Sequence, residues 1–570
     1  MPGLFFLTLC SALLEMIGFS MVIPIFDILI EENAQKNQIT DSISKIFLFL
    51  KIPMSIENIL ILIILIFATK SFFVFITESF QASIITSINR DLQLKVSSLI
   101  ESVNFKFLTQ ERSGKFTNLL GRECNRYSNS IKNLCNLIVQ ILPTIVFIIT
   151  IIIFYPSILL ITIIFFFSSI LIIYPLLKLT KTYSFKTTKE YSETQSNLLE
   201  LVNNYVYLKA TNLSKKFKEI IKQKLTKLRS LTFKSELINL TFAIIKEPAG
   251  VIIISVIIYI KVVQDGHPLQ DIIFVSLILY KIIHRLIDIF NLWQRINMDI
   301  GGFFEVEESL DMLSKNQEKT GSGKRIDINN LISFNNVSFK YGKEKLLKNV
   351  SFNILPLQST AIVGPSGSGK STLIYLLTKL IKPSTGTILI GNENLNNISS
   401  SFYREQIGYV NQDVSLFYGT LKENISFWNR NGLNNKELNK KIFKLLKISD
   451  SLSLFRRLND HIGETGKKLS GGQKQKITIA RELFKDPRLI IFDEATSSMD
   501  SFSEEILQQS LIDLKNKTTV LISHRISTIK KCDNIIVLNN GKIIQQGKFV
   551  KLWNNKKGLF RQLCEKQNLT

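Results

Sequence analysis

The strongest fold signal in this chain is the stretch Gly364-Pro365-Ser366-Gly367-Ser368-Gly369-Lys370-Ser371-Thr372. It fits the pattern G-x-x-x-x-G-K-[ST], a phosphate-binding loop between a strand and a helix. Residues 360–363 before it, Thr-Ala-Ile-Val, are typical of a buried strand, and residues 373–381 after it place leucines on one face of a helix. The alternative is a glycine-rich turn that matches the pattern by chance, and the predicted strand before it and helix after it argue against that. The sequence therefore predicts a nucleoside triphosphate site.

Each residue type in this loop suits phosphate. Glycine lets the backbone turn tightly, so that consecutive N–H groups can point at phosphate oxygens, and the helix start adds a partial positive charge. Lys370 supplies a full charge for the outer phosphates, and the Ser371 hydroxyl is placed to hold Mg²⁺. The predicted nucleotide-binding residues of the loop are Gly364, Ser366, Gly367, Ser368, Gly369, Lys370, Ser371 and Thr372.

Polar residues after other predicted strands complete a hydrolytic site. Asp493 ends the apolar strand 489–492, where a Mg²⁺-coordinating carboxylate belongs, and Glu494 beside it can orient and deprotonate the attacking water. Gln412 can coordinate the metal and sense the γ-phosphate, and His524 can contact the γ-phosphate and the water. The predicted catalytic residues are therefore Glu494, His524 and Gln412, with Ser371, Gln412 and Asp493 as metal ligands.

A second anion site is predicted at the start of the helix 474–483. Ser470, Gly471, Gly472 and Gln473 precede that helix, and a helix N-terminus attracts anions. A lone histidine at a strand end is usually structural and a lone acidic pair usually lies on the surface. Because all these elements occur together, in one order and spacing, we interpret them as one catalytic set.

Length, charge and cysteine content bound the rest of the chain. Its 570 residues are too many for one core, so two or more domains are expected. A net charge of +24 fits either nucleic-acid binding or a membrane protein with basic cytosolic loops. Five scattered cysteines without a C-x-x-C pair indicate neither a disulfide framework nor a zinc site.

The first half of the chain is organised by apolar stretches long enough to cross a membrane. About 20 apolar residues in a helix span the hydrocarbon core. Six candidate spans are predicted, at residues 4–30, 59–76, 134–154, 158–179, 240–263 and 272–293.

The charges of the connecting segments orient these spans. Residues 86–133 hold eight Lys or Arg against four acids, and residues 178–236 hold thirteen against five. Residues 31–57 hold three Lys against four acids, and residues 264–271 hold two Asp and no Lys or Arg. Because basic loops stay in the cytosol, both termini and the nucleotide-binding half are expected there. The basic segments have helical apolar spacing, so they are predicted to extend the membrane helices, and they account for the charge without nucleic acid.

These motifs together resemble the ATP-binding cassette (ABC) transporters, and the pattern Leu469-Ser470-Gly471-Gly472-Gln473 is diagnostic of that superfamily. Six spans followed by one cassette resemble the exporter half-transporters. The resemblance implies an all-α six-helix transmembrane domain followed by an α/β P-loop ATPase with an α-helical signature subdomain. The expected boundaries are 1–312 for the transmembrane domain, 313–325 for a linker and 326–570 for the nucleotide-binding domain.

The resemblance also implies residue roles and a partner. Tyr341 matches the aromatic residue that stacks on adenine, and Asp500 ends a match to the D-loop. The family's coupling helices would fall near 105–126 and 201–217. ATP, with Mg²⁺, would be sandwiched between the P-loop of one chain and the signature helix of another. A second copy of this chain is the expected partner, with a similar half-transporter as the alternative.

Charged residues in the sixth span suggest what is carried. Lys281, Arg285 and Asp288 recur at helical spacing and share a face, and ionisable residues inside spans mark pathways. We expect these cations to meet the anionic head group of an amphipathic substrate. The alternative is that this helix extends past the bilayer and its charges sit at the cytosolic edge. The first-span segments 15–18 and 23–26 resemble the branch that moves lipid-linked oligosaccharides and, more loosely, lipid A flippases.

The sequence favours an ATP-driven exporter or flippase in a bacterial plasma membrane, which moves its substrate outward by alternating access. A peptide, toxin or multidrug exporter is the alternative within transporters, and the last of these needs no cationic face. A nucleotide-gated channel or regulator on the same architecture is the alternative of another class. The six spans argue strongly against a soluble ABC ATPase that acts on ribosomes or DNA.

Overall fold

The computed structural model describes residues 2–29, 38–154, 156–259, 269–318, 323–342, 344–429, 432–449, 451–494, 516–523 and 526–565. The chain forms two compact units. The first comprises Met1–Val103 and Phe107–Gln317, and the second comprises Asn104–Lys106 and Glu318–Thr570. The first unit is helical and the second is α/β, so the predicted fold class is confirmed.

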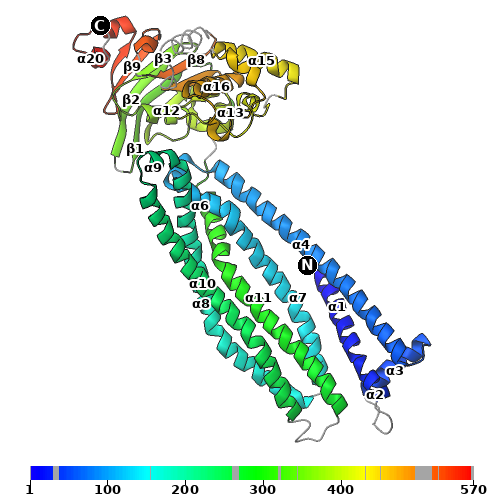
Figure 1. Ribbon diagram of the computed structural model, residues 1–570. Helices are drawn as coiled ribbons and strands as arrows, with labels where there is room; N and C mark the ends of the chain where they lie inside the picture. Colours follow the sequence, from blue (N-terminus) through cyan, green and yellow to red (C-terminus); the bar gives the residue numbers. More distant parts are fainter. Residues whose placement is uncertain are drawn as a thin grey trace. The chain divides into compact units, whose positions relative to one another are not determined.

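Long helices that lie side by side build the first unit (Figure 1). Their bounds are α1 (Pro2–Ser20), α4 (Ile56–Ser102), α7 (Cys124–Phe154), α8 (Pro156–Asn203), α10 (Ser214–Ile258) and α11 (Leu269–Lys315). The basic segments after the predicted spans are continuations of these helices, as expected. The shorter helices are α2 (Val22–Leu29), α3 (Gln38–Leu50), α5 (Phe105–Gln110), α6 (Ser113–Asn118) and α9 (Tyr205–Ala210).

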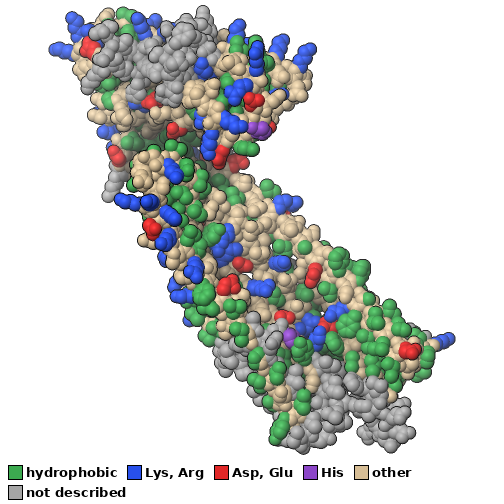
Figure 2. Space-filling model, viewed as in Figure 1, with side chains coloured by type: hydrophobic (Ala, Val, Ile, Leu, Met, Phe, Trp, Pro, Cys, Tyr) green, Lys and Arg blue, Asp and Glu red, His purple; other side chains and the backbone are tan. Residues whose placement is uncertain are grey.

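Side-chain types divide this helical unit. Figure 2 shows hydrophobic side chains over the part formed by α1, α3 and α4, and Lys and Arg along the flank formed by α8 and α10. Among the described residues, three stretches are long and apolar enough to cross a membrane: Phe5–Ile25, Ile56–Ser102 and Ser113–Ile153. The predicted spans 158–179 and 240–263 lie largely on residues whose side chains are not described, and 272–293 carries several charges.

The first predicted span is not one continuous helix. The chain turns at Met21, and α2 restarts at Val22 with Pro24 in its first turn, where a missing N–H costs no hydrogen bond. The acidic segment after it, expected as a connection, contains α3. One face of α3 is buried through Thr40, Ile43 and Phe47, which explains why this polar-looking segment is helical.

A buried polar cluster joins α7, α8 and α11. Arg126 donates to Glu123 at 2.9 Å, to Ser184 Oγ at 2.9 Å and to the Met298 carbonyl at 2.6 Å. Gly301 allows the helices to approach, because a Cβ there would lie 2.9 Å from the Ser184 carbonyl carbon. These three helices are therefore fixed to one another by polar contacts.

The second unit contains two sheets. One has the order β2-β1-β4-β5 and the other the order β10-β9-β3-β8-β7-β6. In the larger sheet β9, β3, β8, β7 and β6 are parallel, and only β10 is antiparallel to its neighbour. The strand bounds are β1 (Ile332–Tyr341), β2 (Glu344–Ile354), β3 (Ser359–Val363), β4 (Thr385–Ile390), β5 (Glu393–Asn394), β6 (Ile407–Val410), β7 (Leu489–Asp493), β8 (Thr518–Ile522), β9 (Asn534–Asn539) and β10 (Lys542–Gly547).

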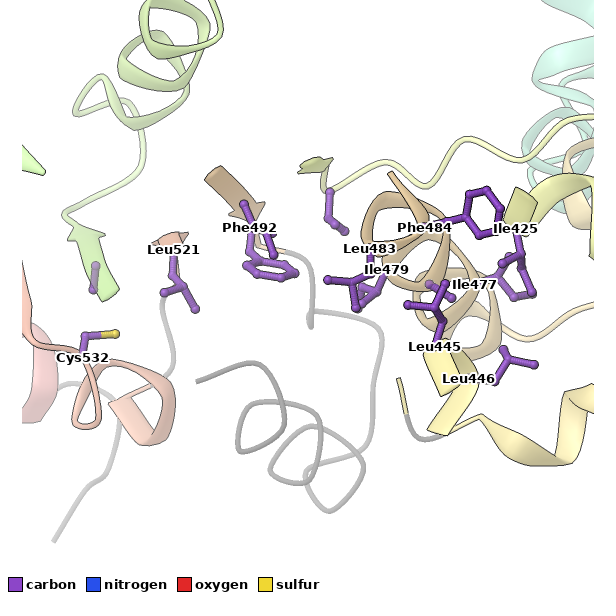
Figure 3. Packing of buried hydrophobic residues seen from close by; sticks show 14 of the residues in the cluster. Ile425, Leu445, Leu446, Ile477, Ile479, Leu483, Phe484, Phe492, Leu521 and Cys532 are labelled. Atoms are coloured by element: carbon purple, nitrogen blue, oxygen red, sulfur yellow. The ribbon is translucent and has the colours of Figure 1, made fainter. Parts of the chain in front are cut away.

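Helices pack on the larger sheet and beside it. Their bounds are α12 (Lys370–Leu377), α13 (Ser400–Glu405), α14 (Leu421–Ser426), α15 (Asn435–Ile448), α16 (Gly471–Phe484), α18 (Ile526–Ile529), α19 (Phe549–Trp553) and α20 (Leu559–Glu565). Buried residues of α14, α15 and α16 form one cluster with Phe492 and Leu521 of the sheet (Figure 3). This core fixes the helix that follows the signature residues to the strand that ends at Asp493.

Candidate functional site

The phosphate loop, Gln412 and the acids Asp493 and Glu494 meet at one edge of the larger sheet. Parallel strands end on the same side, and β3, β8, β7 and β6 are neighbours in the sheet. Asp493 pairs in register with Ile522 of β8, and Ile522 pairs with Ile362 of β3. The loop after β3, the acids that end β7 and the residues after β6 therefore lie at the same edge, where open α/β sheets bind ligands.

Glycines shape the loop after β3. A Cβ at Gly364 would lie 2.1 Å from the Leu538 carbonyl oxygen, so only glycine fits there. Gly369 has φ +104°, and a Cβ there would lie 2.8 Å from Leu347 Cδ2. Gly367 has φ +76° and no atom within 4 Å of a Cβ position, so its outer side is open. The loop is thus closed toward the protein and open outward, as a phosphate cradle requires.

Lys370 begins α12 and folds back over this loop. Its Nζ donates to the carbonyl oxygens of Gly364 and Pro365, each at 3.0 Å. Burial lowers the pKa of Lys370, whereas the nearby carboxylates of Glu494 and Asp493 raise it. Ser368 Oγ is buried and has no hydrogen-bond partner among the described residues. A cation and an unsatisfied hydroxyl in one cradle fit a phosphate ligand.

The remaining loop residues lie at the start of α12. Ser366 and Ser371 are exposed, while Thr372 is buried in the first turn of the helix. The Ser371 hydroxyl therefore stays accessible at the position where a metal ligand is predicted. Tyr341 ends β1 and contacts the Phe339 ring edge-on, with ring centroids 5.0 Å apart, which leaves it half-buried.

Asp493 and Glu494 are held in different ways. Tyr409 donates its hydroxyl to Asp493 Oδ2 at 3.3 Å, and Gln412 Nε2 donates to Glu494 Oε2 at 2.9 Å. Burial raises the pKa of Asp493, the Tyr409 hydroxyl and Lys370 lower it, and the Glu494 carboxylate raises it further. Glu494 has φ +49°, an uncommon conformation for a residue with a side chain, and such strain clusters at functional sites. The structure thus brings together three predicted site residues, Gln412, Asp493 and Glu494.

Tyr409 is a site residue that the sequence analysis did not single out. It lies in β6 opposite Ile491 of β7, and this register places its hydroxyl beside Asp493. An aromatic residue within three positions of Gln412 on an adjacent strand was the available signal. Its partner could be recognised only once the strand order was known.

The predicted second anion site lies at the start of α16. Ser470 is the N-cap: its Oγ accepts from the Gln473 N–H at 3.2 Å, and its own N–H donates to Gln473 Oε1 at 3.1 Å. Ser470 and Gly471 are exposed, and Gly472 is partly so. The helix start is thus preformed and accessible. Asp500 and His524, the other predicted residues of the nucleotide site, lie outside the described residues.

A charged cavity of about 400 Å³ lies in the helical unit. Arg285 and Asp288, two of the three residues predicted to share a face of α11, line it together with Arg295, Glu15 of α1 and Lys70 of α4. Lys281, the third, contacts Glu15. Glu15 contacts Lys70 Nζ at 3.1 Å, Lys281 Nζ at 3.5 Å and an Arg285 guanidinium nitrogen at 2.5 Å. The Glu15 side chain is only 3% exposed. The structure thus brings Lys281 and Arg285 together around one buried carboxylate.

Comparison with known proteins gives the family. The family model described as "ABC transporter" matches residues 347–497, and the model described as "ABC transporter transmembrane region" matches residues 2–283. The chain is similar in fold to a solved structure of a bacterial Atm1-family ABC exporter with ATP bound, with a TM-score of 0.80. That alignment is 22% identical and covers 100% of this chain and 97% of the other.

Curated relatives match about two fifths of the chain. The "ATP-dependent permease MDL1" of Candida albicans is 40% identical over 43% of this chain and 37% of its own length. The "Iron-sulfur clusters transporter ABCB7, mitochondrial" of Rattus norvegicus is 38% identical over 42% and 32%. A "Multidrug resistance ABC transporter ATP-binding and permease protein" of Lactococcus lactis is 36% identical over 42% of each chain. The alignments therefore span less than half of the length of these relatives. Together the two family models match more than half of the chain, which thus belongs to the ABC transporters and combines their transmembrane region with their cassette.

Proposed function

We propose that this chain is an ATP-hydrolysing exporter that moves an anionic amphipathic substrate out of the cytosol. The observation that carries the ATPase part is the meeting of Gln412, Asp493 and Glu494 with the phosphate loop at one sheet edge. Hydrolysis of a phosphoanhydride needs mainly positioning and charge neutralisation, and this edge supplies both.

Each residue at the edge has a proposed task. Lys370 neutralises the outer phosphates, and Glu494 orients the attacking water and accepts its proton while Gln412 holds the carboxylate by its amide. A bound Mg²⁺ would neutralise phosphate charge, and Ser371, Gln412 and Asp493 are the residues that fit as its ligands. We assign Tyr341 to the adenine ring, and Asp500 and His524 to the γ-phosphate side of the site.

We further propose that two copies of the chain form the working unit. The preformed and exposed start of α16 supports this, because an anion site that faces outward can close on the nucleotide of a second chain. A similar half-transporter is the alternative partner. The proposed domain boundaries are 1–312, 313–325 and 326–570, with both termini in the cytosol and the helices in a bacterial plasma membrane.

The depth of the charged cavity supports an anionic cargo. Lys70 follows the start of α4 by 14 residues, or about 21 Å of helix, and Arg285 follows the start of α11 by 16 residues, or about 24 Å. If both helices enter the membrane near these starts, both cations lie within a hydrocarbon core of about 30 Å. Cations at such depth mark a pathway, which favours the anionic cargo over charges at the cytosolic edge. Lipid-linked oligosaccharides and related lipids carry such anionic head groups.

A multidrug exporter is the second candidate. It is favoured by the relative from Lactococcus lactis, whose printed name refers to multidrug resistance. A hydrophobic cationic drug could pair with Glu15 and Asp288 in the same cavity, but it would not interact favourably with Arg285 and Arg295. The two candidates therefore differ in the sign of the charge that stimulates hydrolysis.

The test is ATPase stimulation in phosphatidylcholine proteoliposomes. Lysophosphatidate, lysophosphatidylcholine, a cationic hydrophobic dye and an apolar peptide are titrated against the purified chain. The proposal expects stimulation by lysophosphatidate and little by the zwitterion with the same acyl chain. Stimulation by the dye alone would replace the anionic proposal with the multidrug one. Hydrolysis that needs Glu494 supports the ATPase part in either case.

A further inference from the structure

Glu15 is the central residue of the charged cavity. It is a buried acid in α1 that contacts three cations from two other helices, Lys70 of α4 and Lys281 and Arg285 of α11. One carboxylate against three cations leaves two positive charges of this group uncompensated. An ion group of this kind attracts a further anion, because the low-dielectric surroundings strengthen every charge interaction.

The hydrogen-bond donors around Glu15 are incompletely used. Arg285 donates to Glu15 and to Gln140 Oε1, yet its Nε–H is buried and has no partner among the described residues. Gln81, which is 7% exposed and lines the same cavity, also has an unpartnered amide nitrogen. Both unsatisfied atoms are donors, and buried donors of this kind can donate to the oxygen atoms of a ligand. The cavity therefore fits an oxyanion better than a cation.

The other charges that line the cavity do not reverse its preference for an oxyanion. Arg295 adds a cation, and Glu78 and Asp288 add acids to the lining, so the cavity with Lys281 holds four cations and three acids. Glu78 is exposed, whereas Glu15 is buried and in contact with three cations. Glu15 is thus the acid that occupies the position where an incoming oxyanion would find the most positive charge.

We propose that Glu15 is an internal counter-ion, which holds the anion position of the cavity until the oxyanion of the cargo displaces it. This inference rests on the proposed anionic cargo and adds how the site is regulated. Without cargo, Glu15 ties α1 to α4 and α11 through its ion pairs. When a phosphate takes over Lys281 and Arg285, Glu15 keeps only Lys70, and the ties between α1 and α11 open. Cargo binding thereby changes which helices are held together, which is the differential contact that a transport cycle needs.

The experiment compares Glu15→Gln with the wild-type chain in phosphatidylcholine proteoliposomes, with ATPase stimulation by lysophosphatidate as the readout. Because the competing carboxylate is removed, we expect the half-maximal lysophosphatidate concentration to fall by about tenfold. Glycerol 3-phosphate is titrated in parallel, so that a phosphate on a lipid is distinguished from a free phosphate. The expected fall in half-maximal concentration applies to the compound that stimulates ATP hydrolysis. Glu78→Gln is the matched control, since it removes an acid from the same lining without touching the ion group. It is expected to shift the concentration by less than about threefold.

Two further variants keep the outcomes separable. Arg285→Ala tests the anionic cargo itself: if it leaves the lysophosphatidate response unchanged, the proposed function fails and the counter-ion fails with it. If Arg285→Ala weakens the response but Glu15→Gln leaves it unchanged or weakens it too, Glu15 is a structural partner only and the inference is overturned. If Glu15→Gln is not monodisperse after purification, Glu15→Asp replaces it. Its shorter side chain loosens the pairs, so the same shift is expected at smaller size, and a shift in the opposite direction rejects the proposal.

Discussion

The nucleotide edge and the charged cavity hold their charges by different means. At the sheet edge, Lys370, Asp493 and Glu494 are fixed by the backbone, because each follows directly from a strand or begins a helix. In the cavity, Glu15, Lys70 and Arg285 come from different helices and are held mainly by one another. A backbone-fixed site stays formed through a reaction, whereas an ion group can rearrange when a competing charge arrives. The difference suits a catalytic site in one unit and a displaceable binding site in the other.

The largest expected effect is at the edge. Glu494→Gln removes the proposed base but keeps the amide contact with Gln412, so ATPase activity should fall by about 100-fold or more while nucleotide binding remains. Steady-state phosphate release and binding of a fluorescent ATP analogue measure the two quantities. Glu464→Gln, an exposed acid in the same unit, serves as the control. An unchanged rate in Glu494→Gln would remove Glu494 from the mechanism.

A helix crossing in the first unit gives the next largest effect. Gly301→Ala places a Cβ 2.8 Å from Thr188 Oγ1 and 2.9 Å from the Ser184 backbone, so the fit between α8 and α11 must change. Overpacking of this kind costs about 1–3 kcal/mol, which lowers the apparent Tm in detergent by about 2–6 °C. Gly121→Ala meets no atom within 4 Å and is the matched control. Equal melting temperatures for the two variants would contradict the packing described for α8 and α11.

In the cavity, the loss of a single cation should weaken the binding of the cargo without changing the nucleotide site at the sheet edge. Arg285→Ala should raise the half-maximal lysophosphatidate concentration by about tenfold, since it removes a charge-assisted donor to the anion. Lys234→Ala, which removes an exposed cation of α10, is expected to have no such effect. If the two variants respond alike, general positive charge rather than the cavity attracts the anion.

The smallest predicted effect concerns the contact between Tyr409 and Asp493 at the sheet edge. The Tyr409 hydroxyl lowers the pKa of Asp493, so Tyr409→Phe should raise that pKa further. Asp493 acts as a carboxylate, which is present above its pKa and lost as pH falls through it. The acid limb of the ATPase pH profile should therefore move to higher pH. Tyr418→Phe, an exposed tyrosine, should leave the profile in place.

The same difference explains what the sequence could predict. The phosphate loop and the strands before Asp493 and Gln412 are local patterns, so their places at one sheet edge followed from strand parallelism. The helix α3 was missed because Thr40, Ile43 and Phe47 form a buried face within an acidic segment that was interpreted as a connection. The break at Met21 was missed because hydropathy measures length and apolarity but not direction.

The ion pairs of the cavity could not be predicted from the sequence. Lys281 and Arg285 of α11 could be recognised as candidates from their position in an apolar stretch. The pairing of Glu15 with Arg285 joins residues 270 positions apart, and no local pattern connects them. Only the packing of α1 against α4 and α7, and of α7 against α11, shows that a single acid serves three cations.

The most direct test of the account is ATP-dependent movement of a fluorescent lysophosphatidate across proteoliposomes that carry the chain with its nucleotide-binding unit outside. We expect uptake into the vesicle lumen by the wild-type chain, and loss of uptake in Glu494→Gln at saturating ATP. Uptake that continued in Glu494→Gln at the wild-type rate would show a nucleotide-gated channel instead, and would contradict the claim that hydrolysis at the sheet edge drives transport.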